Sequence, residues 1–124
     1  MDHSKHPLHG KLDAITKLGT FLGDTRIRLL EAIDKQGTVA HAAQVVPLSN
    51  KAVWEAIDAM NDLADQPLVI RPLAGSDDGA ALTEYGRNVV RLFRAMEAEY
   101  QSHLDHLAAT MNNGQARPLD KLRR

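Results

Sequence analysis

The sequence contains no cysteine, which excludes a disulfide framework, a thiolate nucleophile and a zinc site built on thiolates. It has no apolar run long enough to span a bilayer, and its N-terminal residues MDHSKHPLHG lack the apolar core of a signal peptide. These absences predict a cytoplasmic protein without membrane contact. The 124 residues suffice for one domain that buries a core without disulfides or metals.

Charge is nearly balanced in total but unevenly distributed. The net charge of −1 argues against strong nonspecific affinity for nucleic acid. Residues 11–54 carry six basic and four acidic side chains, and residues 87–124 carry seven basic and four acidic ones. Residues 55–86 carry seven acidic side chains and a single basic one, Arg71. A DNA-binding face would therefore draw its positive charge mainly from the first half and the C-terminal segment.

Residues 38–62 predict two helices joined by a tight corner. Thr38 can cap a helix of small side chains, and Val46-Pro47-Leu48 ends that helix because proline lacks an amide proton. Ser49 then caps a second helix. The apolar positions of this second helix recur at spacings of four and three: Val53, Ile57 and Met60. The pattern is typical of a helix-turn-helix, although an alanine-rich helical hairpin would share it.

The flanking segments extend this pair to a winged helix-turn-helix. Asp24 is the expected cap of a preceding helix, and Gly37 its C-terminal stop. Three flanking elements are predicted: a small hairpin over residues 12–22, a helix over 25–36, and two strands at 68–71 and 80–83 around the loop 72–79. The predicted fold class is mainly α with small β-hairpins, a winged helix-turn-helix followed by a long C-terminal dimerisation helix.

Thr83 is the expected N-cap of that last helix, which would be roughly 39 Å long at 1.5 Å per residue. Its apolar stripe predicts a dimer interface made of Val89, Phe93, Met96, Tyr100, Leu104 and Leu107. The alternative is a helix folded back on its own domain. The predicted organisation is a disordered tail at 1–10, the winged domain at 11–83, the dimerisation helix at 84–111 and a disordered tail at 112–124.

The start of the second helix of the pair is the expected reader of DNA. Asn50 can pair bidentately with adenine, Lys51 suits a phosphate, and Ser49 serves as a cap, a phosphate contact or both. Trp54 packs at the edge of the core or stacks near the DNA backbone. The predicted DNA-binding residues are Thr38, His41, Ser49, Asn50, Lys51, Glu55 and Arg71.

No catalytic constellation stands out, so neither an enzyme nor a cofactor is expected. Asp77-Asp78 lies in a loop without a partner base. Histidines recur every third residue in the N-terminal tail (His3, His6 and His9) and again at His103 and His106. Solvated histidines explain both sets better than a metal site does, and a small metal sensor is the less favoured alternative.

Four segments resemble a known family when taken in order. They read TRIRLLEAID-x-x-GTVAHAAQ, LSNKAVWEAIDAMNDL, PLVIRPLAG and ALTEYGRNVVRLF. Over residues 12–107 the chain resembles the N-terminal domain of ModE-type molybdate-responsive transcription regulators, and more distantly the DNA-binding domain of LysR-type regulators. The resemblance implies a homodimeric winged-helix protein that binds a palindromic operator in double-stranded DNA and controls genes of molybdenum metabolism.

The sequence departs from that family in three places. It ends where the oxyanion-binding domains of the family would begin, so the resemblance implies no molybdate-binding domain here. The loop 75–79 is acidic where the family has glycines and a lysine, and Val46-Pro47 replaces the usual glycine at the corner. The acidic loop motivates an alternative: a protein–protein interaction module that pairs through its long helix with a full-length regulator and does not bind DNA productively.

Overall fold

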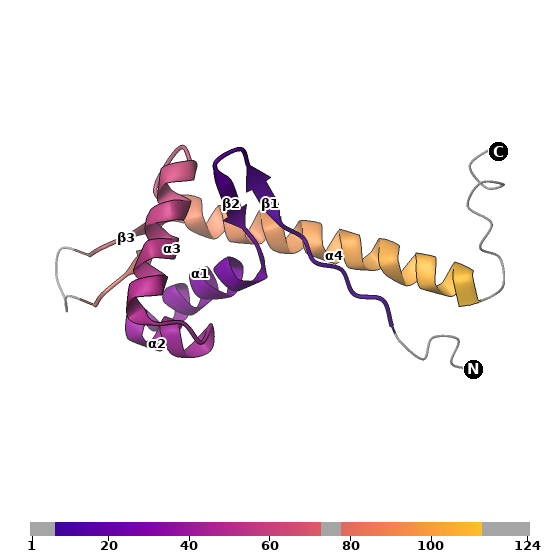
Figure 1. Ribbon diagram of the computed structural model, residues 1–124, viewed down its shortest axis with the longest axis horizontal. Coiled ribbons are helices and arrows are strands. Elements are labelled where there is room, and N and C mark those ends of the chain that lie inside the picture. Colours follow the sequence, from indigo (N-terminus) through magenta and orange to yellow (C-terminus); the bar gives the residue numbers. More distant parts are fainter. Residues whose placement is uncertain (1–6, 73–77, 113–124) are drawn as a thin grey trace. The chain divides into compact units, whose positions relative to one another are not determined.

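The computed structural model describes residues 7–72 and 78–112 (Figure 1). Its elements are β1 (Ala14–Thr16), β2 (Gly19–Leu22), α1 (Asp24–Gln36), α2 (Val39–Val45), α3 (Asn50–Leu63), β3 (Val69–Ile70), β4 (Ala81–Leu82) and α4 (Glu84–Asn112). The predicted fold class is confirmed over the described residues, which form four helices and two antiparallel hairpins in the expected order and end in a long helix. That this helix mediates dimerisation stays a prediction. The described chain divides into two compact units, one over Lys11–Arg94 and one that combines residues 7–10 with residues 95–112.

The first hairpin and α1 follow the predicted turn chemistry, with one correction. Gly19 has φ 134° at the turn between β1 and β2, and Gly37 ends α1 in the left-handed conformation with φ 76°. Both values lie where side chains other than glycine are disfavoured. Asp24 is not the cap of α1: Gly23 holds that position, and Asp24 is the first helical residue. One turn along the helix, its carboxylate pairs with Arg28 at 3.1 Å.

The helix-turn-helix pair has the predicted caps. The Thr38 hydroxyl accepts from the amide of His41 at 3.3 Å, and the Ser49 hydroxyl accepts from the amide of Ala52 at 3.0 Å. Each hydroxyl satisfies one of the first amides of its helix, which have no partner within the helix. Ala42 and Ala43 of α2 lie buried in the core, as a close helix crossing requires, whereas Ala40 is exposed.

One hydrophobic core joins the elements of the Lys11–Arg94 unit. Its large side chains include Leu22, Ile27, Leu29, Leu30, Ile33, Val39, Val53, Ile57, Met60, Leu68, Val69, Leu82 and Phe93. Phe93 was expected at a dimer interface but is only 3% exposed, and Val89 packs partly buried against the same core. The first part of α4 thus directs its apolar stripe into its own domain, and Phe93 has almost no surface left for a second copy.

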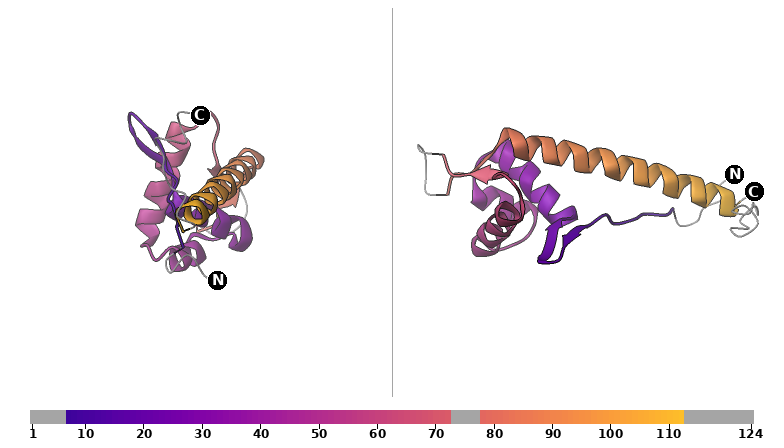
Figure 2. Two further views of the ribbon diagram at one scale, coloured as in Figure 1. Left: turned by 90° about the vertical axis from the view of Figure 1, so that its right-hand side faces the viewer. Right: turned by 90° about the horizontal axis from the view of Figure 1, so that it is seen from above.

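The β3–β4 hairpin is tied to α3 and to the start of α4 through Leu68. The ribbon views show this hairpin beside α3 and the start of α4 (Figure 1; Figure 2). The side-chain oxygen of Asn61 accepts from the amide of Leu68 at 2.8 Å, and its nitrogen donates to Val69 O at 3.0 Å. Thr83 N donates to Leu68 O at 2.9 Å. The hydroxyl of Thr83 accepts from Gly86 N at 2.9 Å, so Thr83 is the N-cap predicted for α4.

We call β3, β4 and the segment between them the wing. Just before β4, the wing is hydrogen-bonded to the junction between α1 and α2. Val39 N donates to the carbonyl of Asp78 at 3.0 Å, and Ala80 N donates to the carbonyl of Gly37 at 3.1 Å. The Asp78 carboxylate accepts from Ala40 N at 2.8 Å. A negative charge is favourable there because the amides at a helix start carry partial positive charge. Of the predicted loop 72–79, residues 73–77 lie outside the described part of the chain.

The second unit contains the later part of α4 and the segment 7–10. Gln101 Nε2 donates to Leu8 O at 2.9 Å, and Gly10 lies against the ring of Tyr100. Residues 7–10 thus contact α4, whereas the rest of the two tails predicted to be disordered, 1–6 and 113–124, lies outside the described residues. No helix over residues 7–72 or 78–112 combines the length and hydropathy needed to cross a membrane.

We predict that Gly86→Ala lowers the free energy of unfolding by about 1–3 kcal/mol. A methyl group at this position would overlap the carbonyl oxygen of Leu68, which Thr83 holds in place. Urea unfolding followed by circular dichroism measures the change. Asn88→Ala, at an exposed position two residues further along α4, is the matched control and should change stability by less than about 0.5 kcal/mol. A more stable Gly86→Ala variant would contradict the close approach, since helix propensity alone favours alanine.

We predict that Asp78→Ala lowers the free energy of unfolding by about 1–2 kcal/mol, because Ala40 N loses its acceptor at the start of α2. Asp78→Asn keeps an acceptor and should lose less. Asp62→Ala removes the same charge from an exposed site on α3 and serves as the control in the same urea titration. Equal stabilities of the Asp78→Ala and Asp62→Ala variants would refute the capping role.

Candidate nucleic-acid interface

The start of α3 presents two free polar side chains. Ser49 caps the helix with its hydroxyl, and Asn50 and Lys51 are its first two residues. Both are exposed, and neither side chain has a hydrogen-bond or ion-pair partner among the described residues. The Asn50 amide can pair with a base edge, and the Lys51 ammonium can approach a phosphate. This is the chemistry predicted for these positions, and their roles on DNA remain predictions.

The start of α2 is more fully occupied by contacts within the protein. Thr38 Oγ1 caps the helix and also lies 2.7 Å from Nδ1 of His41. The amide of Ala40, also in the first turn of this helix, donates to the Asp78 carboxylate. Thr38 is half-buried, whereas His41 is exposed. The His41 ring is therefore the more accessible of the two predicted contacts at this helix.

The rest of the exposed side of α3 is acidic. After Lys51, the exposed charged residues along this helix and its end are all carboxylates: Glu55, Asp58, Asp62 and Asp65. Carboxylates repel phosphates, and a carboxylate in the groove can accept only from a base such as cytosine through N4. Of the four, Glu55 lies one turn from Lys51 and is the one predicted to reach a base. Phosphate contacts by α3 are thereby confined to its first turn.

Arg71 adds a cation over Trp54, in the second turn of α3. Its guanidinium carbon lies 3.6 Å from the centroid of the Trp54 ring. Trp54 packs partly buried against the core, which supports the alternative that placed it at the core edge. Its ring also carries the Arg71 cation. The sequence placed Arg71 among the candidates, but nothing in it indicated this contact between α3 and the wing.

One of the two aspartates in the acidic loop 75–79, Asp78, is engaged by the protein itself. The Asp78 carboxylate accepts a hydrogen bond at the start of α2, so its charge is partly compensated within the protein. Asp77 lies outside the described residues. The sequence did not reveal the role of Asp78, because the contact joins positions 38 residues apart. Two adjacent aspartates look the same in a sequence whether their side chains face solvent or the protein.

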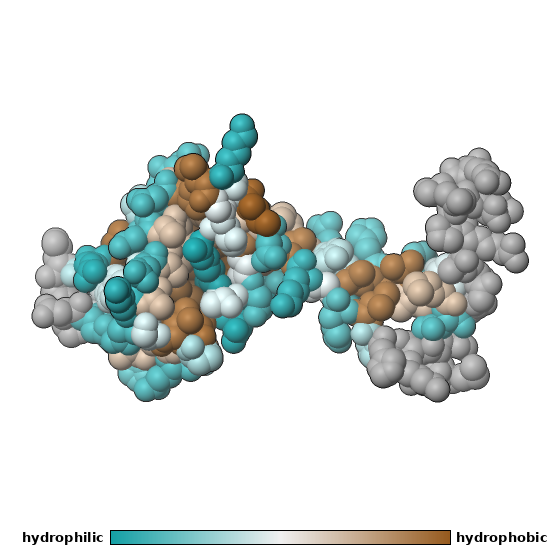
Figure 3. Space-filling view, viewed as in Figure 1, coloured by the Kyte–Doolittle hydropathy of each residue, from teal (hydrophilic) through white to brown (hydrophobic). Residues whose placement is uncertain are grey.

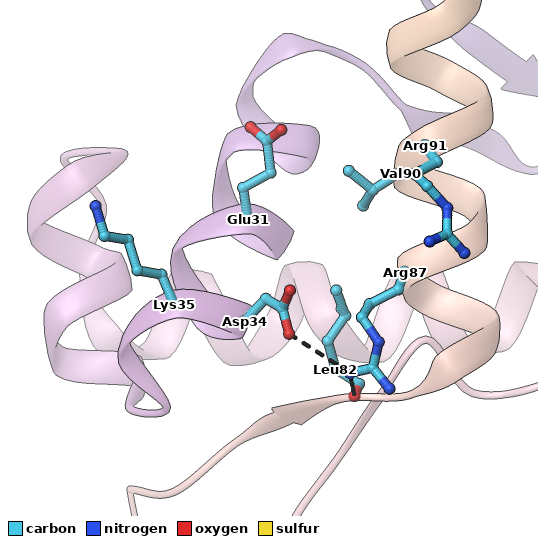
Figure 4. A pocket seen from close by; sticks show the side chains of 7 residues that line it. All are labelled: Glu31, Asp34, Lys35, Leu82, Arg87, Val90 and Arg91. Carbon is cyan, nitrogen blue, oxygen red and sulfur yellow. Dashed lines mark hydrogen bonds and ion pairs between the residues drawn. The ribbon is translucent and has the colours of Figure 1, made fainter.

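A surface pocket of about 320 Å³ lies between α1 and the first part of α4 (Figure 4). Asp34 on its α1 side pairs with Arg87 of α4 at 3.5 Å, and Arg87 also donates to Leu82 O at 3.1 Å. Nearby, Arg94 pairs with Glu31 at 2.6 Å. The acidic side chains of α1 and the arginines of α4 thus form ion pairs with one another, and these pairs connect α1 to α4.

Among the described residues, no three histidine, aspartate or glutamate side chains gather where they could hold a metal ion. His103 and His106, the pair singled out in the sequence, both lie exposed on α4. The histidines at positions 3 and 6 fall outside the described residues.

Comparison with known proteins shows the family to which the chain belongs. A family profile described as "bacterial regulatory helix-turn-helix protein, lysR family" matches residues 25–87, which run from α1 into the first turn of α4. The chain is 56% identical over 98 residues to the molybdenum transport protein ModE of Azotobacter vinelandii, covering 78% of this chain and 36% of that protein.

Two further relatives carry related names. The molybdenum-pterin-binding protein MopA of Rhodobacter capsulatus is 44% identical over 77 residues, covering 61% of this chain and 29% of that protein. The DNA-binding transcriptional dual regulator ModE of Escherichia coli K12 is 32% identical over 103 residues, covering 82% of this chain and 38% of that protein. The chain therefore spans about a third of the length of these relatives. It belongs to the lysR family of bacterial regulatory helix-turn-helix proteins, which are DNA-binding regulators, and it is similar over most of its length to regulators named ModE.

Proposed function

We propose that this chain is a sequence-specific, cytoplasmic transcription regulator of ModE type that binds a palindromic operator as a homodimer. The observation that carries the proposal is the start of α3 in a member of a DNA-binding family, where Asn50 and Lys51 are exposed and unpaired among the described residues. A helix start with free polar groups is the part of a helix-turn-helix that enters the major groove.

Each predicted contact takes a role from its chemistry. Asn50 reads a base edge, and Lys51 contacts a phosphate and positions the domain. Ser49 lies at the start of α3, where backbone amides favour a phosphate beside the groove. The first amides of α2 already donate within the protein, so Thr38 and His41 contact a phosphate through their side chains. Glu55, one turn into α3, selects a base with an exocyclic amine. Arg71 adds a phosphate contact from the wing.

The homodimer uses the later part of α4. Met96, Tyr100 and Leu107 are exposed at 52%, 38% and 46%, and Leu104 between them is half-buried. The space-filling view shows hydrophobic surface on the later part of α4 (Figure 3). Exposed apolar side chains at helical spacing favour burial against a second helix. The proposed interface therefore begins at Met96, after Phe93 has turned into the core, and a second copy of this chain covers it.

The link to molybdenum rests on the names of the relatives. The Azotobacter protein is named for molybdenum transport and the Rhodobacter protein for molybdenum-pterin binding. We propose that the operators of this chain lie beside genes of molybdenum metabolism. Because the chain covers about a third of these proteins, the proposal concerns the DNA-binding function alone.

One observation favours the alternative interaction module. Four exposed carboxylates follow Lys51 along α3 and its end, and they oppose the approach of a phosphate backbone. In this alternative, the long helix pairs with a full-length two-domain regulator and the heterodimer does not bind DNA productively. A stable heterodimer together with a homodimer that binds no duplex would favour it.

A selection experiment tests the main proposal. The purified chain is mixed with a library of randomised duplexes, bound sequences are enriched, and fluorescence anisotropy then compares an enriched duplex with its scrambled counterpart over a salt series. We expect an inverted repeat with half-sites about 10 bp apart, and an affinity that falls with salt. Failure to enrich any sequence would contradict the proposal.

We predict that Asn50→Ala and Lys51→Ala weaken binding in different ways. Asn50→Ala should reduce the preference for the enriched duplex over the scrambled one, with a loss of about 1–3 kcal/mol at the affected base. Lys51→Ala should weaken binding to both duplexes alike and reduce the salt slope by about 1. Anisotropy titrations on both duplexes measure these losses. Equal losses of specific and nonspecific binding in both variants would refute the assigned roles.

We predict that Leu107→Asp weakens the homodimer about tenfold or more, because it places a carboxylate in the proposed apolar interface. Sedimentation equilibrium measures the dissociation constant. Ser102→Asp adds the same carboxylate at another exposed position of α4 and is the matched control. A dimer equally tolerant of both substitutions would place the interface elsewhere.

A further inference from the structure

Trp54 and Arg71 form a mixed pair at the edge of α3. The guanidinium carbon of Arg71 lies 3.6 Å from the centroid of the indole ring, well inside the range in which a cation is attracted to an aromatic face. Trp54 is half-buried and Arg71 is exposed, so the ring is supported from below and the cation lies at the surface. The pair joins the second turn of α3 to the residue that follows β3.

The fold forces these two residues together. Asn61 lies seven residues after Trp54, so both project from the same side of α3 about two turns apart. Asn61 binds the backbone of Leu68 and Val69, which fixes β3 against the far end of this side. The strand then continues toward the start of α3, where Arg71 meets the Trp54 ring. Asn50 and Lys51 lie one turn before Trp54, on neighbouring positions of the helix surface.

The contact leaves the hydrogen-bonding capacity of Arg71 unused. Stacking on a ring holds the guanidinium by its flat face, while its N–H donors point outward in the plane of the group. No carboxylate or carbonyl group among the described residues binds Arg71. An arginine held in this way keeps its full charge and a fixed fork of donors, the geometry that suits two oxygens of one phosphate.

We propose that Trp54 is a positioning residue which presents Arg71 to a phosphate of the DNA backbone beside the groove entered by α3. The inference rests on the proposed DNA-binding function and deepens it by naming the contact and the residue that orients it. The same pair offsets the carboxylates of α3, because it places a cation over Trp54, one turn after Lys51. A contact between Arg71 and a phosphate does not distinguish one base from another, so it strengthens binding to all DNA sequences.

Anisotropy on the enriched and scrambled duplexes over a salt series tests this assignment. Arg71→Gln should weaken binding to both duplexes about tenfold and reduce the salt slope by about 1. Trp54→Leu should weaken both duplexes in the same direction, while Trp54→Phe should keep part of the effect because it retains an aromatic face. Arg91→Gln, an exposed arginine of α4, is the matched control and should leave the slope unchanged.

A double-mutant cycle separates positioning from stability. If Trp54 acts through Arg71, then Trp54→Leu should have little further effect on affinity in the Arg71→Gln background. Additive losses would overturn the positioning role, and thermal unfolding of each variant shows that the domain is folded. Trp54 is the only tryptophan of the chain, so its emission reports the stack directly in the free protein. Identical emission in the wild type and Arg71→Gln would also overturn the pair.

The failure of this inference and the failure of the proposed function give different results. A wild-type chain that binds neither duplex overturns both. A wild-type chain that binds the enriched duplex, with Arg71→Gln showing the same affinity and salt slope, overturns only the phosphate contact. Loss of affinity in Arg71→Gln without any loss in Trp54→Leu overturns only the role of Trp54.

Discussion

The wing is held to the helical part of the domain by the backbone of one buried residue, Leu68. Its amide donates to Asn61 of α3, and its carbonyl accepts from the backbone of Thr83 just before α4. Gly86 approaches that carbonyl so closely that a larger residue would overlap it. A buried peptide group without partners is costly, so these bonds set the register of β3 against both helices.

The proposed DNA-binding surface follows from that attachment. With β3 bound to Asn61, the chain emerges along α3 at Trp54 and brings Arg71 to its ring. On its return, the wing ends at Asp78, whose carboxylate is turned into the start of α2. The two cations on this side of the domain thus lie within the first two turns of α3, with Lys51 in the first turn and Arg71 over Trp54, while most of the exposed carboxylates lie further along the helix. Such a helix favours an approach to DNA by its first turn, and its near-zero net charge keeps nonspecific attraction weak.

The sequence predicted what is encoded locally. The caps at Thr38, Ser49 and Thr83 and the order of the elements follow from short-range chemistry, and the structure confirms them. Contacts between distant segments could not be predicted in this way. The apolar stripe of α4 does not indicate that Phe93 faces its own core, and no periodicity connects Arg71 with Trp54 or Asp78 with Ala40. For the candidate site, the sequence identified exposed polar residues at the helix starts, but the neighbours that orient them come from the tertiary fold.

The most direct test of this account is a titration of the isotopically labelled chain with an enriched duplex, followed by amide and indole NMR signals. The account predicts that the largest shifts occur at Ser49, Asn50 and Lys51, at the Trp54 indole and at Arg71, with small shifts along the acidic end of α3. Shifts confined to α4, with the start of α3 unchanged under conditions where the duplex binds, would contradict it.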